Sequence, residues 1–257
     1  MRHPEIHHII VSCNAEGCML RCAAGKRQAF TVTLGDAVND RGLAMTSSFS
    51  NMVLFGQCMA HVHDLAPYEA ILHHLVEAGK TFLPHAADAA AALAAESYDM
   101  VCFLGSGALE GVAVESALKV LELTAGRILT MSQSAMGLRH GPMAALDKTT
   151  LLVAFLSSDE NVARYERDLL QEIMQKRLVK TRIAVGGHSE LSLDGLADRY
   201  LAPDIRTPVP DDCRPPVDVI FGQLLGLFFS MRCNLMPDRP SVDGVISRVV
   251  QNVKTYA

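Results

Sequence analysis

Short apolar runs alternate with stretches of helical period along most of the chain. In the first 95 residues, two runs of apolar residues surround a short amphipathic segment, and longer segments with an apolar period near 3.6 follow them. The segment 35–42, which joins the second apolar run to the first of these longer segments, is rich in Gly, Asp and Asn, and this composition favours a loop. We expect strands at 9–11 and 29–34, and helices at 16–24, 46–63, 67–79 and 86–96.

From Tyr98 onward the alternation becomes regular. Each short apolar run is followed by a helical segment, as in a parallel sheet with helices on both faces. The last helix is apolar nearly all round, which favours burial against another domain or subunit, so we expect a homodimer or a larger homo-oligomer. We expect strands at 98–104, 128–132, 151–156, 181–185 and, at an edge, 200–202, with helices at 108–125, 160–176 and 217–235.

The predicted fold class is therefore α/β, a doubly wound parallel sheet flanked by helices. The strands are unevenly divided, with two before residue 95 and four or five after it. Two parallel strands do not form a self-sufficient sheet, so the first domain looks cut short. We expect part of a first domain with connecting helices at 1–95, a complete second domain at 96–215, and a C-terminal helix and tail at 216–257 that pack on the site or a dimer interface.

Composition narrows the class of protein. The 257 residues carry 23 Lys and Arg against 28 Asp and Glu, a net charge of −5, and 49% are hydrophobic, which excludes a disordered chain or a nucleic-acid coat. Apolar runs stay well below the ~20 residues of a membrane span. The first five residues lack the apolar core of a signal peptide. We expect a cytoplasmic protein without nucleic-acid or membrane partners.

Three of the seven cysteines, Cys13, Cys18 and Cys22, lie close together in the sequence. Their spacing matches neither ferredoxin patterns nor a zinc ribbon, so a metal site is the weaker alternative. An odd number of cysteines also argues against a disulfide framework. Because Cys18 and Cys22 are four residues apart on a predicted amphipathic helix, we interpret them as buried free thiols.

One predicted helix carries three charged residues on a single face. Glu115, Lys119 and Glu122 stand at i, i+4 and i+7, which stacks them across two turns. A carboxylate beside an ammonium could move a proton next to a sugar carbonyl. The alternative is a solvated Glu-Lys-Glu stripe that stabilises the helix by a few tenths of a kcal/mol per pair.

Other candidates lie in loops. His140 lies in a predicted loop, 137–142, where Gly and Pro fix the backbone, and an imidazole there could exchange a proton with a ring oxygen or simply be exposed. The loop Gly105-Ser106-Gly107 joins a strand to a helix and could bind an anion, or be only a tight turn. Thr46, Ser47 and Ser48 offer hydroxyls at a helix start, although capping alone would explain them.

Taken together, these segments resemble a known family. The carrying motifs are Phe103-Leu104-Gly105-Ser106-Gly107, Glu115-Ser116-Ala117-Leu118-Lys119-Val120-Leu121-Glu122-Leu123-Thr124-Ala125-Gly126, Gly137-Leu138-Arg139-His140-Gly141-Pro142, the segment 40–48 and the segment 240–251. They are similar to the second sugar-isomerase (SIS) domain of the tagatose-6-phosphate ketose/aldose isomerases and galactosamine-6-phosphate deaminase-isomerases. The isomerase half of glucosamine-6-phosphate synthase is a more distant relative.

The resemblance implies an aldose–ketose isomerisation, with possible deamination, of a hexose or hexosamine 6-phosphate. By motif, Glu122 matches the carboxylate that moves a proton between the first two sugar carbons, and His140 matches the ring-opening histidine that a neighbouring subunit lends. Glu115 and Lys119 would support them, and Arg248 in the tail would contact substrate. Substrate contacts are also expected from Arg139, the Thr46–Ser48 cluster and the glycine loop. No metal or organic cofactor is implied.

Three departures from the family pattern favour a rival interpretation. Val114 and Met143 stand where the family has basic residues. The two phosphate-holding loops of the first SIS domain, Thr-Gly-Ala-Gly-Thr-Ser and Ser-Arg-Ser-Gly-Asn-Ser, occur nowhere in the 257 residues. The alternative is therefore a catalytically incompetent SIS fragment or a sugar-phosphate-binding protein.

Overall fold

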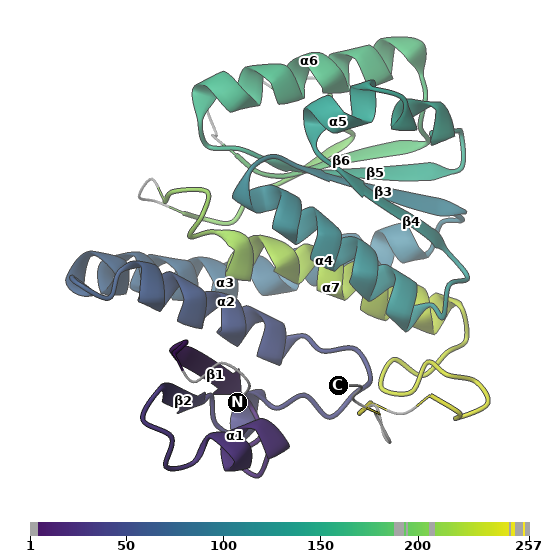
Figure 1. Ribbon diagram of the computed structural model, residues 1–257. Coiled ribbons are helices and arrows are strands. Elements are labelled where there is room, and N and C mark those ends of the chain that lie inside the picture. Colours follow the sequence, from purple (N-terminus) through teal and green to yellow (C-terminus); the bar gives the residue numbers. More distant parts are fainter. Residues whose placement is uncertain are drawn as a thin grey trace.

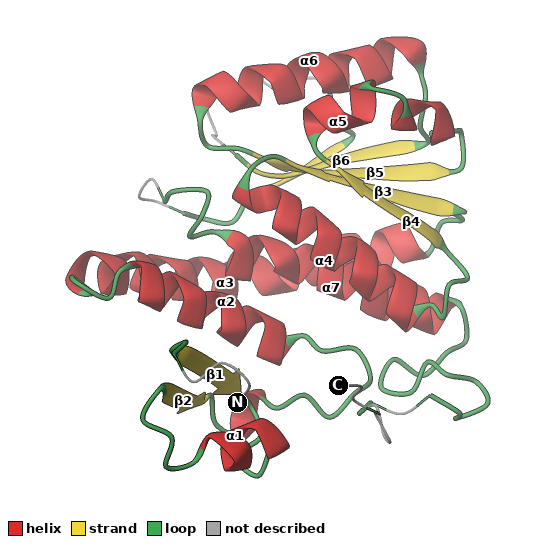
Figure 2. Cartoon of the chain, viewed as in Figure 1, coloured by secondary structure: helices red, strands yellow, loops and turns green. Residues whose placement is uncertain are grey.

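The main body is a parallel sheet between two layers of helices (Figures 1 and 2). The computed structural model describes residues 5–187, 193, 195–205, 209–246, 248, 249 and 254. Five strands pair in the order β4-β3-β5-β6-β7, and each pairing is parallel. Their bounds are β3 Met100–Gly105, β4 Leu129–Gln133, β5 Thr150–Leu156, β6 Thr181–Gly186 and β7 Arg199–Leu201. The predicted fold class is confirmed.

Helices cover both faces of this sheet. On one face lie α4 (Ala108–Leu123), α7 (Pro215–Arg232) and α3 (Ala66–Ala94), and on the other lie α5 (Ala135–Arg139) and α6 (Glu160–Lys176) (Figure 1). The central strands β3 and β5 are almost wholly buried, because their residues are apolar on both faces. The N-terminal residues form a separate small unit at the bottom of Figure 1, and α2 (Ser47–Ala60) connects this unit to α3.

That small unit is a two-stranded parallel sheet with one short helix. Strand β1 (His8–Ser12) pairs with β2 (Ala29–Thr33), and α1 (Cys18–Ala23) connects them. Ile9 and Phe30 are exposed on it although both are large and apolar. The strands predicted in this part of the chain are confirmed.

Two helix predictions are corrected. Instead of two helices around residue 80, α3 runs unbroken through Pro84. Proline lacks the N–H that would bond to the carbonyl four residues earlier. Burial of Phe82 and Ala86, on either side of Pro84, holds both parts of the helix against the core. The predicted loop around His140 contains the short helix α5, followed by a 3-10 turn at Pro142–Ala145.

The apolar last helix, α7, is covered within the chain itself. It packs between α4 and α3 (Figure 1), and its side chains Phe221, Leu225 and Phe229 are buried there. Its apolar character therefore follows from this intramolecular packing and does not require a partner subunit. In the part of the chain that the structure describes, no helix has the length and hydropathy to cross a bilayer.

The prediction for the cysteines is wrong. Cys18 and Cys22 are exposed, whereas the buried side of α1 consists of Leu20 and Ala23. The helix is only six residues long, so its narrow apolar side accommodates these two residues and leaves the thiols on the outer side. Among the described residues, no group of three or more His, Cys, Asp or Glu side chains could hold a metal ion.

Candidate active site

The three charged residues of α4 form a linked cluster. Lys119 Nζ lies 2.7 Å from Glu122 Oε2 and 3.4 Å from Glu115 Oε1. The side chain of Lys119 is 4% exposed and that of Glu115 is 9% exposed, whereas that of Glu122 is 29% exposed. A solvated Glu-Lys-Glu stripe would leave all three side chains exposed to water. The burial of Lys119 and Glu115 therefore excludes such a stripe as the whole explanation. Glu122 is the member of the cluster that reaches the surface.

Close packing of α7 on α4 buries this cluster. A Cβ atom on Gly222 would lie 2.0 Å from Ser116 Oγ, and one on Gly226 would lie 3.0 Å from the carbonyl oxygen of Lys119. Only glycine at these two positions lets the helix backbones approach so closely. The same contact removes water from Glu115 and Lys119, which lie on the adjoining turns.

Burial changes the proton affinity of Glu115. Desolvation raises the pKa of this carboxyl to about 7, although the neighbouring Lys119 ammonium acts in the opposite direction. The side chain can therefore be protonated or ionised near neutral pH. When Glu115 is ionised, Lys119 faces two carboxylates, those of Glu115 and Glu122. When Glu115 is protonated, Glu122 is the one negative charge of the cluster paired with Lys119.

Glu122 lines a cavity of 590 Å³ that the C-terminal tail partly encloses. Leu43 and Ala125 form its other fixed walls, and the tail contributes residues of the segment 240–246. The tail is held to the segment before α2, since Leu43 N–H donates to the carbonyl oxygen of Asp238 at 3.1 Å. The predicted base thus faces an open cavity that could receive a small molecule.

Arg248, the predicted tail contact, is placed beside the small N-terminal unit. Its guanidinium donates to Asn39 Oδ1, and it interacts electrostatically with Cys13. This position ties the tail to the segment before α2. A contact between Arg248 and a bound sugar stays a prediction.

The Thr46–Ser48 cluster surrounds a carboxylate of the chain itself. Asp40 accepts five hydrogen bonds, from the backbone N–H groups of Thr46, Ser47 and Ser48 and from the hydroxyls of Thr46 and Ser48. Partial burial acts to raise the pKa of Asp40, but these hydrogen bonds together lower it. Asp40 therefore occupies the position at the start of α2 where the sequence suggested a substrate contact.

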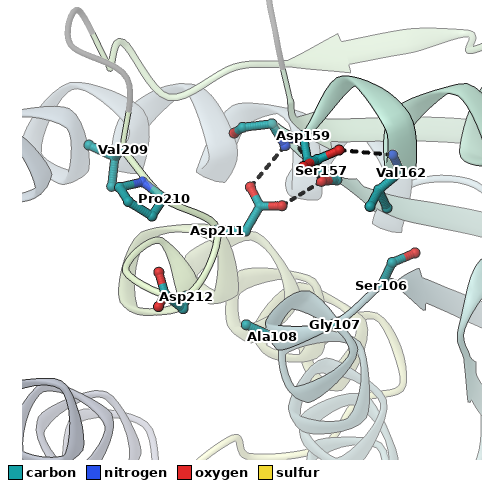
Figure 3. A pocket seen from close by; sticks show the side chains of 11 residues that line it. Ser106, Gly107, Ala108, Ser157, Asp159, Val162, Val209, Pro210, Asp211 and Asp212 are labelled. Atoms are coloured by element: carbon teal, nitrogen blue, oxygen red, sulfur yellow. Dashed lines mark hydrogen bonds between the residues drawn. The ribbon is translucent and has the colours of Figure 1, made fainter. Parts of the chain in front are cut away.

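The glycine loop lines a second cavity, of 580 Å³, at the carboxyl ends of the strands (Figure 3). The chain leaves β3 toward β4 on one side and returns to β5 on the other, so this cavity lies at the topological switch point. Gly107 begins α4 with a φ of +59°, and a Cβ on Gly105 would lie 2.1 Å from the carbonyl oxygen of Leu109. Both glycines are required by the tight turn.

Acidic side chains on the opposite wall bind the polar groups of this cavity. Asp211 accepts hydrogen bonds from the Ser157 hydroxyl at 2.5 Å and from the Ser158 N–H at 2.8 Å. Asp159 caps α6 through the N–H groups of Asn161 and Val162, and its position across the cavity is visible in Figure 3. The carboxylates of the chain thus use donors that an anionic ligand would need here.

A buried ion network supports this wall, and the sequence did not suggest it. Arg214, 2% exposed, donates to Asp211 at 3.0 Å, to the Ser158 hydroxyl at 2.6 Å and to the fully buried Asp218 at 2.7 Å. Burial raises the pKa of Asp218 to about 6, against the lowering effect of Arg214. One sequence feature could have indicated this network. Arg214 and Asp218 are four residues apart at the start of a helix that contains two prolines.

His140 and Arg139 lie on the other face of the sheet from Glu122. His140 is exposed at the C-terminal end of α5, and Arg139 pairs with Glu172 of α6 at 3.0 Å. Helix α4, which carries Glu122, is on the opposite face (Figure 1). One chain therefore does not bring His140 to Glu122, and a site with both residues would need a second chain.

Val114 and Met143, two of the three departures from the family pattern, have different surroundings. Val114 is 52% exposed on α4, on the turn before Leu118, which is exposed as well. Met143 lies in the 3-10 turn after His140 and packs against the core cluster under α5 and α6. A basic residue at Val114 would be solvated, whereas one at Met143 would compete with apolar packing.

In its fold and over nearly its whole sequence, the chain is similar to proteins of the sugar-isomerase (SIS) family. It is 35% identical over 255 residues to a Streptomyces coelicolor protein provisionally named D-galactosamine-6-phosphate deaminase AgaS, covering 98% of this chain and 65% of that protein. It is 32% identical over 262 residues to the D-galactosamine-6-phosphate deaminase AgaS of Escherichia coli O157:H7, covering 97% and 64%.

Among solved structures, one from Clostridium novyi NT, provisionally named a tagatose-6-phosphate ketose/aldose isomerase, matches with a TM-score of 0.91 and 31% identity. That match covers 98% of this chain and 65% of the other. The chain thus spans slightly less than two thirds of the length of these relatives. No protein-family model matches it.

Proposed function

We propose that the chain carries the proton-transfer half of an isomerase or deaminase that acts on a hexose or hexosamine 6-phosphate. The observation that carries the proposal is the pairing of Glu122 with the buried Lys119 at the wall of the 590 Å³ cavity. Enediol chemistry needs a base that faces the substrate and a positive charge near the oxygen that gains electrons. Glu122 supplies the base at the cavity wall, and Lys119, buried 2.7 Å behind its carboxylate, supplies the positive charge.

In the proposed reaction, Glu122 removes the proton from the second carbon of the open-chain aldose. The electron pair forms a double bond to the first carbon, and the carbonyl oxygen there takes a proton from solvent, which gives an enediol. Glu122 then returns its proton to the first carbon while the hydroxyl on the second carbon gives up its proton to solvent, which leaves a ketone at the second carbon. With an amine at the second carbon the same steps leave an imine, and water hydrolyses it to the ketone and ammonia.

Ring opening is assigned to His140, which would come from a second copy of the chain. Because α5 and α4 are on opposite faces of the sheet, His140 of one chain must reach Glu122 of another. The imidazole would take the proton of the anomeric hydroxyl and supply one to the ring oxygen. We therefore propose that the active form is a homodimer or a larger homo-oligomer.

The experiment is turnover of galactosamine 6-phosphate and tagatose 6-phosphate by the chain and by Glu122→Gln, with ammonia measured separately. Gln keeps the shape of the side chain but cannot take the proton. We expect loss of turnover with substrate binding retained. Unchanged turnover in Glu122→Gln would refute the assignment of the base, and ammonia release would separate deamination from simple isomerisation.

One observation favours a second candidate, a catalytically incompetent fragment of this fold or a sugar-phosphate-binding protein: the two phosphate-holding loops of the family's first domain occur nowhere in the 257 residues. At the start of α2 and at the Ser157–Ser158 turn, the carboxylates of Asp40 and Asp211 already accept the N–H donors that a catalytic site would offer to a phosphate. Isothermal titration with galactosamine 6-phosphate distinguishes the two functions. Binding without turnover supports this second function, whereas turnover by the 257-residue chain excludes it.

A further inference from the structure

The short helix α1 carries two thiols that neither the fold nor the proposed reaction uses. Cys18 and Cys22 are four residues apart, both are exposed, and their sulfur atoms are 3.7 Å from each other. Core packing of the helix is provided by Leu20 and Ala23 on its other side. Two adjacent thiols on an exposed surface are accessible to the same reagent molecule.

We propose that Cys18 and Cys22 form a redox-active dithiol that exchanges with small-molecule disulfides such as oxidised glutathione. The thiolate of one cysteine attacks a sulfur of the reagent, which breaks the S–S bond and releases one thiol. The second cysteine, having lost its proton to solvent, attacks the protein sulfur of the mixed disulfide and releases the second thiol. The protein loses two electrons and two protons, and one disulfide becomes two thiols.

Oxidation must distort α1. A disulfide needs sulfur atoms about 2.05 Å apart and Cβ atoms about 3.8 Å apart, so the two sulfurs must approach by about 1.7 Å from their present separation. Residues at i and i+4 of a regular helix have Cβ atoms roughly 5–6 Å apart. The bridge therefore forms only if the turn between the two cysteines changes its backbone conformation.

The local structure keeps the free-energy cost of that backbone change low. Helix α1 has six residues, too few to be stable by itself, and the start at Gly17 has no side-chain cap. A strained, exposed disulfide is more easily reduced than a relaxed buried one. The bridge should therefore be reversible and respond to the ratio of reduced to oxidised thiol in solution.

The surroundings also favour an anionic reagent. Arg21, Lys26 and Arg27 are exposed and lie within five residues of Cys22 in the sequence, whereas Glu16 is the one acidic residue in the segment 14–28. Opposite charge raises the rate at which oxidised glutathione, which carries carboxylates, encounters the pair. Cys13 lies in a different environment, since partial burial and the nearby Asp40 raise the pKa of its thiol. It is thus a suitable control position.

The test is incubation of the chain in glutathione buffers of increasing oxidation, followed by peptide mass spectrometry. We expect the wild type and the control Cys13→Ser to form a bridge between Cys18 and Cys22, with loss of two hydrogen atoms and full reversal by dithiothreitol. Cys18→Ser and Cys22→Ser should instead retain one glutathione on the remaining thiol. Amide hydrogen exchange over residues 18–24 should become faster on oxidation of the wild type and stay unchanged in the double Ser variant.

Three results would overturn the proposal. One is stable glutathionylation of the wild type at Cys18 or Cys22 without an internal bridge. Another is a bridge that joins one of them to Cys13. The third is full resistance of both thiols to oxidised glutathione. Each of these outcomes is independent of sugar-phosphate turnover, so the dithiol and the proposed function can fail separately.

Discussion

Gly222 of α7 and Ser116 of α4 are in close contact. A Cβ atom on Gly222 would lie 2.0 Å from the Ser116 hydroxyl oxygen and 3.0 Å from the Ser116 Cα. The contact lies one residue from Glu115 and three residues from Lys119 in α4. It joins the helix that carries the proposed base to the helix that buries the supporting cluster. The shape of the site therefore depends on this crossing.

The first prediction concerns this crossing. Gly222→Ala must separate α7 from α4, and we expect a loss of stability of about 1–3 kcal/mol, measured by urea denaturation. Gly111→Ala is the matched control within α4, because the described residues place nothing within 4 Å of its Cβ. Alanine is the better helix former there, so this control should be neutral or stabilising by up to about 1 kcal/mol. Equal effects in the two variants would contradict the close crossing.

The second prediction uses the titration of Glu115. Its pKa is about 7 in the fold against an ordinary value of 4.5, so between these two pH values the folded state holds a proton that the unfolded state has lost. This group's contribution to stability therefore falls as pH rises from about 4.5 to 7. We expect the Tm of Glu115→Gln, relative to wild type, to be higher at pH 8 than at pH 5.

The control for that experiment is Glu110→Gln, which removes an exposed carboxylate from the first turn of the same helix. Its Tm relative to wild type should change much less over this pH range. A Glu115→Gln variant whose relative Tm is independent of pH would show that the carboxyl is not desolvated by α7.

The third prediction concerns the buried ion network. Arg214→Ala leaves Asp218 buried without its cation, and breaking such a pair by removing one partner costs about 3–5 kcal/mol. Arg164→Ala removes an arginine whose ion pair with Glu160 is largely exposed, and it should change stability far less than Arg214→Ala does. Denaturant unfolding of both variants makes the comparison, and similar losses would contradict the buried network.

The fourth prediction tests the shared site. Glu122→Gln and His140→Ala chains, each inactive alone, should recover part of the turnover when they are unfolded together and refolded as mixed oligomers. Mixed assemblies would contain one site with both native residues. A mixture of Glu122→Gln chains with a second Glu122 variant is the control, since it offers no intact site. Failure of the first mixture to exceed this control would argue against a site built from two chains.

The periodicity of hydrophobic residues along the sequence was sufficient to predict most of the fold. Strands such as Met100–Gly105 and Thr150–Leu156 are continuous apolar runs because both faces of the sheet are covered, and that pattern is local. The Glu115, Lys119 and Glu122 face was predictable for the same reason, since helix geometry fixes it. The unbroken α3 was not, because tertiary packing on both sides of Pro84 overrides the local effect of proline.

Contacts between distant segments could not be predicted. The hydrogen bonds of Asp40 are made to residues six to eight positions away, across a loop whose conformation the sequence does not specify. The pairing of Arg214 with the Ser158 hydroxyl joins residues 56 positions apart. Exposure of Cys18 likewise depends on how α1 sits on its two strands, and the helical period alone suggested the opposite face.

Glu122 is proposed to move a proton at the second carbon of a sugar phosphate. The most direct measurement follows the hydrogen on that carbon by NMR, with galactosamine 6-phosphate in deuterated water. We expect the wild-type chain to exchange this hydrogen for deuterium and Glu122→Gln to bind the sugar without exchange. Exchange by Glu122→Gln at the rate of the wild type would show that Glu122 is not the base.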